Sequence, residues 1–547
     1  MKLNKYSLNI NETVHRVFNQ IRKIYLNSKI YDKKISSNNL KALIYKPSLN
    51  IISSIAKYEK KKNKIEDFET ERIWEINKLS FADYKKLNNF FWLFSVDLKS
   101  SKKICLSIIN KWIESNKKYN CDLWEIDTLS KRIISWISNS QLTYDEGDKT
   151  YKEKFNKIIF KQVNHLVNEI KKSANYDDKL IGCTAVILTG ISYDEENYLV
   201  FGLNLLKKII TSSFNTDYFP KSRSIRQLVF YLKYFILVRE LLKESSNEVP
   251  EYLNEIIFHL GKGYDFVWSS IKQSLLFNGN HVSNLEDFDK YLDNHKYSFK
   301  NDKKDLGGYG ILSNKHIILG MDIGSPPESN FSENYQSGPL SFEAIFKGEK
   351  IVCNSGFFQN FNNKLNLISR STAAHSTLVL NNNSVANFSI NFRGKIFSKS
   401  HFNTLNKKVV CERNYWLIKA SHDGYIKDYG TIHERLLEFF PEKNKFSGTD
   451  RLIKNKNFKP TNFEIRFHLM PTTKVTKTQD RKIILIELEN SAWRFCSEYG
   501  SIDVETGLYF GNKNDYSENQ NIFISGLTDK NDQEIKWEIN KRDGIFH

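Results

Sequence analysis

Three arginines of this 547-residue sequence are candidates for binding an anionic group. Arg223 and Arg226 lie in the segment TDYFPKSRSIRQL, and Arg370 begins the segment RSTAAHST. A guanidinium group is planar and permanently charged, and its paired donors match a carboxylate or a sulfate. The three residues therefore predict binding of an acidic substrate, with an ion pair to a neighbouring acid as the alternative role.

Two polar clusters carry amide, imidazole, carboxyl or phenol groups, which can bind a ligand or transfer a proton. They are Asn278, Asn280 and His281 in one segment, and His422, Asp423 and Tyr425 in another. Each cluster also contains an Asn-Gly or Asp-Gly pair, which favours a tight turn on its own account. Turn formation is therefore the alternative role for both clusters.

Helices are expected to position the residues of the first half. From about Ala82 to Trp268, apolar residues recur at three- and four-residue spacing in blocks separated by short polar breaks, a pattern typical of amphipathic helices. Helices joined by short loops favour a bundle, a solenoid or a toroid, and the lack of a recurring repeat weakens the solenoid. Four tryptophans on the apolar sides of these helices are predicted to pack in the core rather than to stack on sugars: Trp92, Trp112, Trp124 and Trp136.

Strands are expected to position the residues of the second half. Short runs with alternating apolar residues, such as His316 to Met321 and Val409 to Ala420, are separated by turns rich in Gly and Asn, and this pattern predicts a large antiparallel sandwich. The charge-dense stretch from Asn284 to Asp305 marks the boundary between the halves. We therefore predict an N-terminal extension over 1–80, a helical domain over 81–285, a linker over 286–306 and a β-sandwich over 307–547.

Charge and composition narrow the classes of function. Lys and Arg exceed Asp and Glu by 18, which favours an anionic partner, although lysines spread along the whole chain also fit a drift in base composition. No aromatic RNA-binding strand, zinc finger or basic recognition helix supports a nucleic-acid partner. The P-loop, H-E-x-x-H and G-x-S-x-G signatures are all absent from the sequence.

Membrane and export signals are also missing from the sequence. No apolar run approaches the roughly 20 residues that span a bilayer, and the N-terminus has neither an uninterrupted apolar core nor a cleavage site of small residues. These features predict no membrane span and, taken alone, a cytoplasmic location. The six scattered cysteines form no C-x-x-C pair, which argues against a zinc ribbon or a disulfide framework.

The second half resembles the C-terminal domain of heparinase II/III-like proteins. Three segments occur in the order and spacing of that family: GGYGILSNKHIILGMDIGSPP (307–327), LSFEAIFKGEKIVCNSG (340–356) and RSTAAHSTLVLNN (370–382). The segments TDYFPKSRSIRQL (216–228) and LLFNGN (275–280) extend the likeness into the helical half. The resemblance implies an incomplete (α/α) toroid followed by an antiparallel β-sandwich.

The resemblance also implies an activity, because family members cleave uronic-acid polysaccharides by β-elimination. That reaction needs a group that neutralises the uronate carboxylate, a base for the adjacent proton and an acid for the leaving oxygen. An active lyase with a rearranged set of residues would use Tyr425 or His375 as the base and Arg370 as the neutraliser. The resemblance implies an acidic polysaccharide or oligosaccharide as the partner and suggests a location in the bacterial periplasm or cell envelope. The residues expected to bind the glycan are Arg223, Arg226, Asn278, Asn280, His281, Asn354 and His422.

Several positions depart from the family pattern. Active members carry an H-A-D element before L-S-F-E, where this chain has YQSGP (335–339), and the family's Asp of a D-x-G element falls on Asn354. His375 is what remains of a His/Asp/His metal set, so we expect neither a metal nor another cofactor. Gln227 stands where the family has a catalytic Tyr, and an amide cannot abstract a proton.

Two hypotheses follow from these comparisons. The first is an active lyase of a divergent subgroup, and the second is a catalytically degenerate protein that binds or helps to process an envelope glycan. The loss of several groups at once favours the second, whereas the resemblance itself favours the first. No feature of the sequence predicts an oligomeric state.

Overall fold

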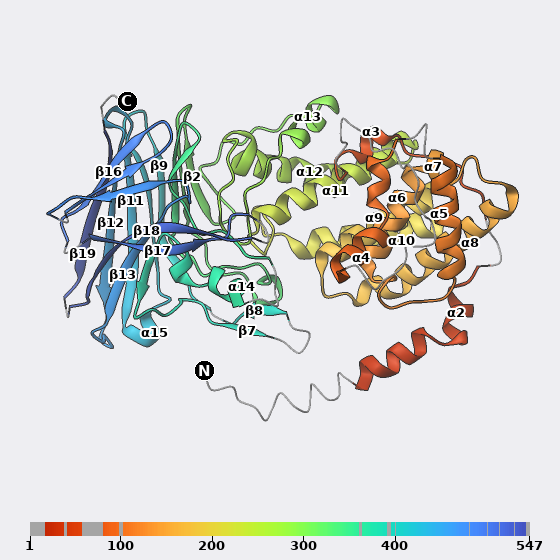
Figure 1. The fold of residues 1–547 in the computed structure, drawn as a ribbon, viewed down its shortest axis with the longest axis horizontal. Coiled ribbons are helices and arrows are strands. Elements are labelled where there is room, and N and C mark those ends of the chain that lie inside the picture. The colour runs from red at the N-terminus through yellow and green to blue at the C-terminus, as the bar shows by residue number, and fades with distance from the viewer. Residues whose placement is uncertain are drawn as a thin grey trace. The chain divides into compact units, whose positions relative to one another are not determined.

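The computed structural model of the protein describes residues 17–37, 41–56, 80–97, 102–359, 364–390, 395–399, 401–480, 482–499, 502–512, 515–529 and 531–542. Much of the predicted N-terminal extension, namely residues 1–16, 38–40 and 57–79, lies outside the described residues. The chain divides into two compact units. We call them the helical unit (1–213 and 230–258) and the β-rich unit (214–229 and 259–547) (Figure 1).

The helical unit consists of helices, as the apolar periodicity of the first half predicts. After a helix over residues 17–26 they are α2 (Lys29–Ile35), α3 (Leu49–Ile52), α4 (Phe81–Asn88), η2 (Phe91–Ser95), α5 (Lys102–Ser115), α6 (Ile126–Ser138), α7 (Ser140–Thr143), α8 (Lys149–Glu169), η3 (Ile170–Lys172), α9 (Tyr176–Ser192) and α10 (Glu196–Ser213). Two further helices, α11 (Ile225–Glu244) and α12 (Glu251–Tyr264), each have residues in both units.

The core of the helical unit forms around α9, whose residues from Leu180 to Ser192 are all buried. Its start is capped by the Asn175 side chain, which accepts from the backbone N–H of Asp177. Helix α10 packs closely on it, because Gly202 leaves room for Ile187, where a Cβ atom would come within 2.4 Å of a side-chain carbon. The tryptophan prediction is confirmed at three positions, Trp112, Trp124 and Trp136, which are fully buried. Trp92 is half-buried.

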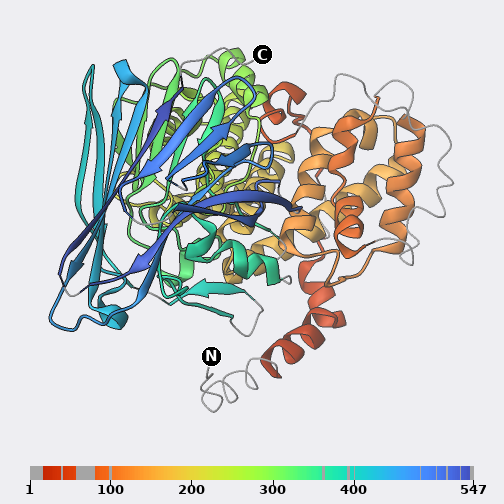
Figure 2. The ribbon, with the colours of Figure 1, turned by 60° about the vertical axis from the view of Figure 1, so that its left-hand side comes forward.

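In the β-rich unit, η4 (Asp265–Ser269) and α13 (Glu286–Asn294) follow the end of α12, and the chain beyond them consists mainly of strands (Figure 2). The strands are β1 (Asp305–Leu306), β2 (Tyr309–Ser313), β3 (Ile317–Asp322), β4 (Phe342–Phe346), β5 (Glu349–Val352), β6 (Leu378–Leu380), β7 (Phe388–Ile390), β8 (Ile396–Ser398), β9 (Thr404–Cys411), β10 (Trp416–His422), β11 (Thr431–Phe440), β12 (Lys445–Lys454), β13 (Asn462–His468), β14 (Lys474–Lys477), β15 (Ile483–Glu487), β16 (Ala492–Ser497), β17 (Ile502–Tyr509), β18 (Ser517–Leu527) and β19 (Gln533–Lys541). Short helical turns interrupt them at η5 (Ser329–Phe331), α14 (Lys364–Ser369), η6 (Thr372–Ala374), α15 (Ile426–Tyr429) and η7 (Pro441–Lys443).

The strands form antiparallel sheets. A five-stranded sheet has the order β1-β2-β3-β4-β5, an eight-stranded sheet β14-β15-β16-β19-β12-β11-β10-β9, and a four-stranded sheet β17-β18-β13-β6. Alternate residues of β12 are buried, as expected for a strand with one face on the core. Aromatic and aliphatic side chains of these three sheets, among them Phe342, Phe467 and Trp537, share one hydrophobic core.

The structure differs from the predicted linker over 286–306, because α13 lies within that segment. The helix buries Phe288, Tyr291 and Leu292 at the three- and four-residue spacing of one face, which its many charged residues obscure in the sequence. Residues 214–229 and 259–285, which the periodicity assigns to the helical domain, belong to the β-rich unit. No helix among the described residues is both long enough and apolar enough to cross a bilayer.

A buried carboxylate links three strands inside the sandwich. Asp450 of β12 accepts at Oδ1 from Arg435 Nε at 2.7 Å, and the same oxygen lies 2.7 Å from His433 Nε2, both residues being on β11. Its Oδ2 accepts from Trp537 Nε1 of β19 at 2.9 Å. Burial alone would raise the pKa of Asp450, but Arg435 and His433 outweigh that effect and hold the pKa below its ordinary value.

Replacing Asp450 by Asn should lower the free energy of unfolding by about 3–5 kcal/mol, because Arg435 would remain charged in the core without a counter-charge. Urea denaturation followed by tryptophan fluorescence measures this loss. The matched control is Asp428→Asn at an exposed carboxylate of α15, which should change stability by less than about 0.5 kcal/mol. An equal loss in both variants would contradict the role of Asp450.

Candidate functional site

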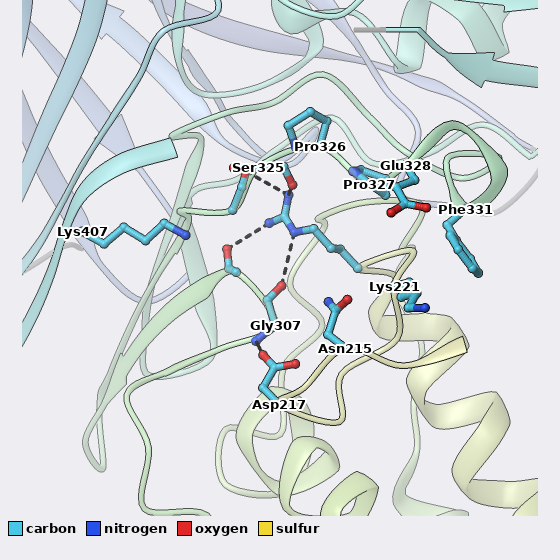
Figure 3. A pocket seen from close by; sticks show the side chains of 13 residues that line it. Asn215, Asp217, Lys221, Gly307, Ser325, Pro326, Pro327, Glu328, Phe331 and Lys407 are labelled. Carbon is cyan, nitrogen blue, oxygen red and sulfur yellow. Dashed lines mark hydrogen bonds between the residues drawn. The ribbon is translucent and has the colours of Figure 1, made fainter. Parts of the chain in front are cut away.

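A polar pocket of about 330 Å³ lies within the β-rich unit (Figure 3). The loop before α11, the turn between β1 and β2, the loop after β3 and strand β9 supply its walls. The lining residues are Asn215, Asp217, Lys221, Arg223, Gly307, Gly308, Gly324, Ser325, Pro326, Pro327, Glu328, Phe331 and Lys407. Most of these side chains carry a charge or a hydrogen-bonding group, so the pocket is suited to a polar ligand.

Arg223 forms part of the wall, and all five of its N–H donors are used by protein oxygens. The acceptors are the main-chain oxygens of Gly307, Gly308, Gly324 and Ser325, at 2.9 to 3.2 Å, and the carboxylate of Asp322, at 2.5 Å. Burial disfavours the charge of Arg223, but Asp322 and Tyr309 outweigh it and raise the pKa of the guanidinium above its ordinary value. The guanidinium therefore joins the loops around the pocket.

Two glycines make this arrangement possible. A Cβ atom on Gly324 would lie 2.3 Å from Arg223 Cζ, and one on Gly308, whose φ is +82°, would lie 2.8 Å from Arg223 Nε. Arg223 itself has a left-handed φ of 59°, a conformation that a non-glycine residue keeps only when its surroundings enforce it. The Tyr309 hydroxyl donates to the Arg223 carbonyl, and the guanidinium carbon lies 5.0 Å from the centroid of the Tyr309 ring.

Asn278 supports the same ion pair from behind the pocket. Its Nδ2 donates to Asp322 Oδ2 at 3.1 Å and to the Tyr309 hydroxyl at 2.6 Å. Arg223 and Asn278, both predicted to bind substrate, thus meet at Asp322. Asn280 is buried and donates to the Leu275 carbonyl, whereas the half-buried His281 lies at the side chain of Gln359.

Two lysines face the pocket from opposite sides (Figure 3). The ammonium group of Lys221 lies 5.5 Å from the centroid of the Phe331 ring. Within the part of the chain that the structure describes, neither Lys221 nor Lys407 has a hydrogen-bond or ion-pair partner. Burial and the charge of Arg223 lower the pKa of Lys407. These two ammonium groups are therefore cationic donors that an anionic ligand could use.

Two carboxylates complete the lining of the pocket. Asp217 accepts from the backbone N–H groups of Phe219 and Gly307, so it is part of the wall. Glu328 is exposed, and Figure 3 shows it near Pro327 and Phe331. A carboxylate in this position can accept hydrogen bonds from hydroxyl groups of a ligand. The pocket thus offers cationic donors together with an acceptor.

Arg370, the predicted neutraliser, lies in the interior. It donates to Asn366 Oδ1 at 2.8 Å and to the main-chain oxygens of Tyr335 at 3.0 Å and Glu333 at 2.6 Å. Burial lowers the pKa of its guanidinium to about 9. These bonds hold the segment before β4 against α14, and its role as a neutraliser stays a prediction.

His375, a predicted base, is fully buried after η6. Its Nδ1 lies 2.8 Å from the Ser371 carbonyl, and its Nε2 has no hydrogen-bond partner among the described residues. Burial lowers the pKa of its imidazole to about 4, so the ring is neutral at pH 7. Asn354 is also buried. Its side chain accepts from the Ser376 N–H and donates to Glu343. The other carboxylate oxygen of Glu343 pairs with Lys350 at 2.7 Å.

His422 and Tyr425 are brought together, with ring centroids 5.5 Å apart, but in the core of the sandwich. His422 Nε2 lies 3.3 Å from His433 Nδ1, and the Tyr425 hydroxyl donates to the Leu378 carbonyl of β6. Burial lowers the pKa of His422 and raises that of Tyr425. The cluster therefore joins strands of the core, and the proposal of Tyr425 as a base stays untested.

Arg223 is thus the one predicted site residue among those that line the described pocket, while Arg226 lies half-buried in the first turn of α11. Sequence reasoning missed Lys221, Lys407 and Glu328. Lys221 stands inside the segment TDYFPKSRSIRQL, which could have drawn attention to it, whereas Lys407 belongs to no motif. No cluster of three or more His, Cys, Asp or Glu side chains that could hold a metal occurs among the described residues.

Comparisons with known proteins relate the sequence of the chain to a family model and its structure to a known fold. Residues 302–538 match the family model described as Heparinase II/III-like, C-terminal. Among curated protein sequences, none matches the chain significantly. The heparan sulfate lyase HepC from Pedobacter heparinus has a TM-score of 0.62 at 14% identity, over 89% of this chain and 79% of that one.

Two heparinase III structures are also similar. Their TM-scores are 0.66 and 0.67 at 15% and 14% identity, and the alignments cover 85% and 91% of this chain and 77% and 85% of theirs. At such identities the likeness concerns the fold. It confirms the predicted fold class, in which a helical part precedes an antiparallel β part.

Replacing Gly324 by Ala should lower the free energy of unfolding by about 1–3 kcal/mol, because the added Cβ atom would displace the Arg223 guanidinium. A double-mutant cycle with Arg223→Ala, measured by urea denaturation, tests this origin. In the Arg223→Ala background the cost of Gly324→Ala should shrink by at least about 1 kcal/mol. An unchanged cost would show that the clash lies elsewhere.

The buried imidazole of His375 predicts a loss of stability in acid. Its pKa rises from about 4 in the folded chain to about 6.5 on unfolding. The unfolded state therefore binds the extra proton, and the stability present above pH 6.5 is lost as the pH falls towards 4.

The variant His375→Gln should reduce the slope of unfolding free energy against pH by up to about 1.4 kcal/mol per pH unit in this window. Urea denaturation at a series of pH values gives the slope. The same substitution at the exposed His316 is the control. An undiminished slope in His375→Gln would contradict the assignment.

Proposed function

We propose that this chain, whose residues 302–538 match the family model described as Heparinase II/III-like, C-terminal, is a divergent member of that family and binds a uronic-acid-containing glycan. An anionic group of the glycan is held in the pocket between Lys221 and Lys407. The observation that supports this proposal is that both lysines line the pocket and that neither ammonium group has a hydrogen-bond or ion-pair partner among the described residues. Arg223 shapes the pocket and leaves the anion to the lysines.

The chemistry of the lining fits an acidic sugar. An ammonium group donates charge-assisted hydrogen bonds to a carboxylate or sulfate in several orientations. Glu328 and Asn215 offer acceptors for ring hydroxyl groups on the same pocket wall. A neutral sugar would leave both ammonium groups without a counter-charge, so the pocket favours an acidic residue of the glycan.

Cleavage by β-elimination is the second candidate function, and the likeness in fold to a heparan sulfate lyase and to heparinase III favours it. The residues proposed for the chemistry are His375, Tyr425 and Arg370. In the structure each of them is buried and bonded to neighbouring main-chain groups. Binding of the glycan is therefore the primary proposal, and lyase activity is a separate outcome of the same experiment.

Titration calorimetry with uronate oligosaccharides and with neutral oligosaccharides tests the binding. We expect binding of the acidic set, and a loss of affinity of about tenfold or more in Lys221→Gln and in Lys407→Gln, because each variant removes a charged hydrogen-bond donor. Raising the pH through the lowered pKa of Lys407 should weaken binding in the wild type, and Lys407→Gln should remove that step.

The matched control is Lys315→Gln, at an exposed lysine between β2 and β3, which should bind like the wild type. Equal affinity for neutral oligosaccharides, or no effect of the two pocket variants, would sink the proposed binding mode. Following the absorbance of an unsaturated product in the same mixtures separates the two functions. Product formation that His375→Gln abolishes would establish β-elimination.

A further inference from the structure

The helix over residues 17–26 exposes apolar side chains along one side. Val17, Phe18, Ile21 and Ile24 are exposed by 49%, 67%, 59% and 72%, and Ile30 in α2 by 75%. Positions 17, 21 and 24 follow the spacing of one helix face, and Phe18 borders it. Because soluble proteins rarely leave such apolar side chains together on their surface, this face calls for a partner.

The helix is attached to its unit by other side chains. Leu26 is buried, Arg22 pairs with Glu169 of α8, and the Tyr31 hydroxyl of α2 lies 2.7 Å from His165 Nδ1. In both ribbon views the red helix before α2 projects from the helical unit (Figures 1 and 2). The exposed apolar face is therefore distinct from the side that holds the segment in place.

Exposed positive charge accompanies this face. Between residues 17 and 35 the sequence has five cations, Arg22, Lys23, Lys29, Lys33 and Lys34, and one acid, Asp32. The acid pairs with Lys161 at 2.5 Å. All four lysines are exposed. The segment thus carries exposed positive charge in addition to its apolar face.

We propose that the segment 17–35 docks on the surface of a membrane that contains anionic lipids. Phe18, Ile21 and Ile24 enter the boundary between headgroups and acyl chains, and the lysines contact the anionic headgroups. A bilayer interface offers both kinds of environment side by side, whereas an apolar groove of a protein would satisfy the aliphatic face alone. Docking of this kind is reversible and weakens with salt.

Co-sedimentation of the full chain with vesicles tests the proposal. We expect binding to vesicles of phosphatidylcholine mixed with phosphatidylserine, and much weaker binding to phosphatidylcholine alone. Phe18→Ser/Ile21→Ser should weaken binding at least about tenfold, because two exposed apolar groups no longer enter the interface. Lys29→Gln/Lys33→Gln should weaken binding and reduce its salt dependence.

The matched control is Phe81→Ser/Val200→Ser, which removes two exposed apolar groups from α4 and α10 and should leave vesicle binding unchanged. Circular dichroism establishes that each variant is folded. The proposal is overturned by absence of binding to the mixed vesicles, or by an equal effect of the control pair. It is also overturned if Phe18→Ser/Ile21→Ser instead dissociates a dimer that ignores vesicles. Lys221→Gln should still bind vesicles, so this test is independent of the glycan pocket.

Discussion

The ion pair between Arg223 and Asp322 is the contact on which the candidate pocket depends. Removing two charges from water costs several kcal/mol per ion unless other bonds compensate. Compensation is complete on the arginine side, where every donor has an acceptor. On the acid side, Asn278 and the Gly324 N–H bond the carboxylate oxygens. The pair thereby sets the spacing of the loops that carry the pocket residues.

This arrangement separates the shaping of the pocket from the recognition of a ligand. An arginine that bound substrate directly would impose a planar, two-pronged geometry on the anion. Because Arg223 is bonded to the wall, the ammonium groups that line the pocket are those of Lys221 and Lys407, whose flexible stems can follow the position of a charge. Under the proposed glycan binding, such a pocket would accommodate anionic groups of more than one shape.

The fold class could be predicted from the sequence because its signals are local. The helical spacing of apolar residues in the first half directly indicates helices, and their alternation in the second half directly indicates strands. Helix α13 was not predicted, because its charged residues obscure the helical spacing of Phe288, Tyr291 and Leu292. The site was harder to predict, because Arg223 was expected to bind an acidic substrate or to pair with a neighbouring acid. Most of its acceptors are main-chain oxygens, which no residue type reveals. Lys407 lies on β9 and lines the pocket beside Gly307 and Gly324, residues that are far from it in the sequence.

The polar cluster around His422 and Tyr425 also lies where the sequence could not place it. His422 and Tyr425 stand beside an Asp-Gly pair, so a surface turn was a natural expectation. Every residue of strand β10 except Lys419 is instead buried, and the partner of His422 comes from the neighbouring strand β11. Polar residues inside a sandwich are satisfied across strands, and a single sequence gives no measure of which strands are neighbours.

The eight-stranded sheet ends in β9 on one side and β14 on the other. An open edge offers unpaired main-chain groups to any other chain, and lysines on edge strands oppose such pairing. Each of the two end strands carries two lysines, which are Lys407 and Lys408 on β9 and Lys474 and Lys477 on β14. Part of the chain's positive charge thus opposes edge-to-edge pairing of this sheet. On β9, Lys407 has this position on the edge strand and also lines the pocket.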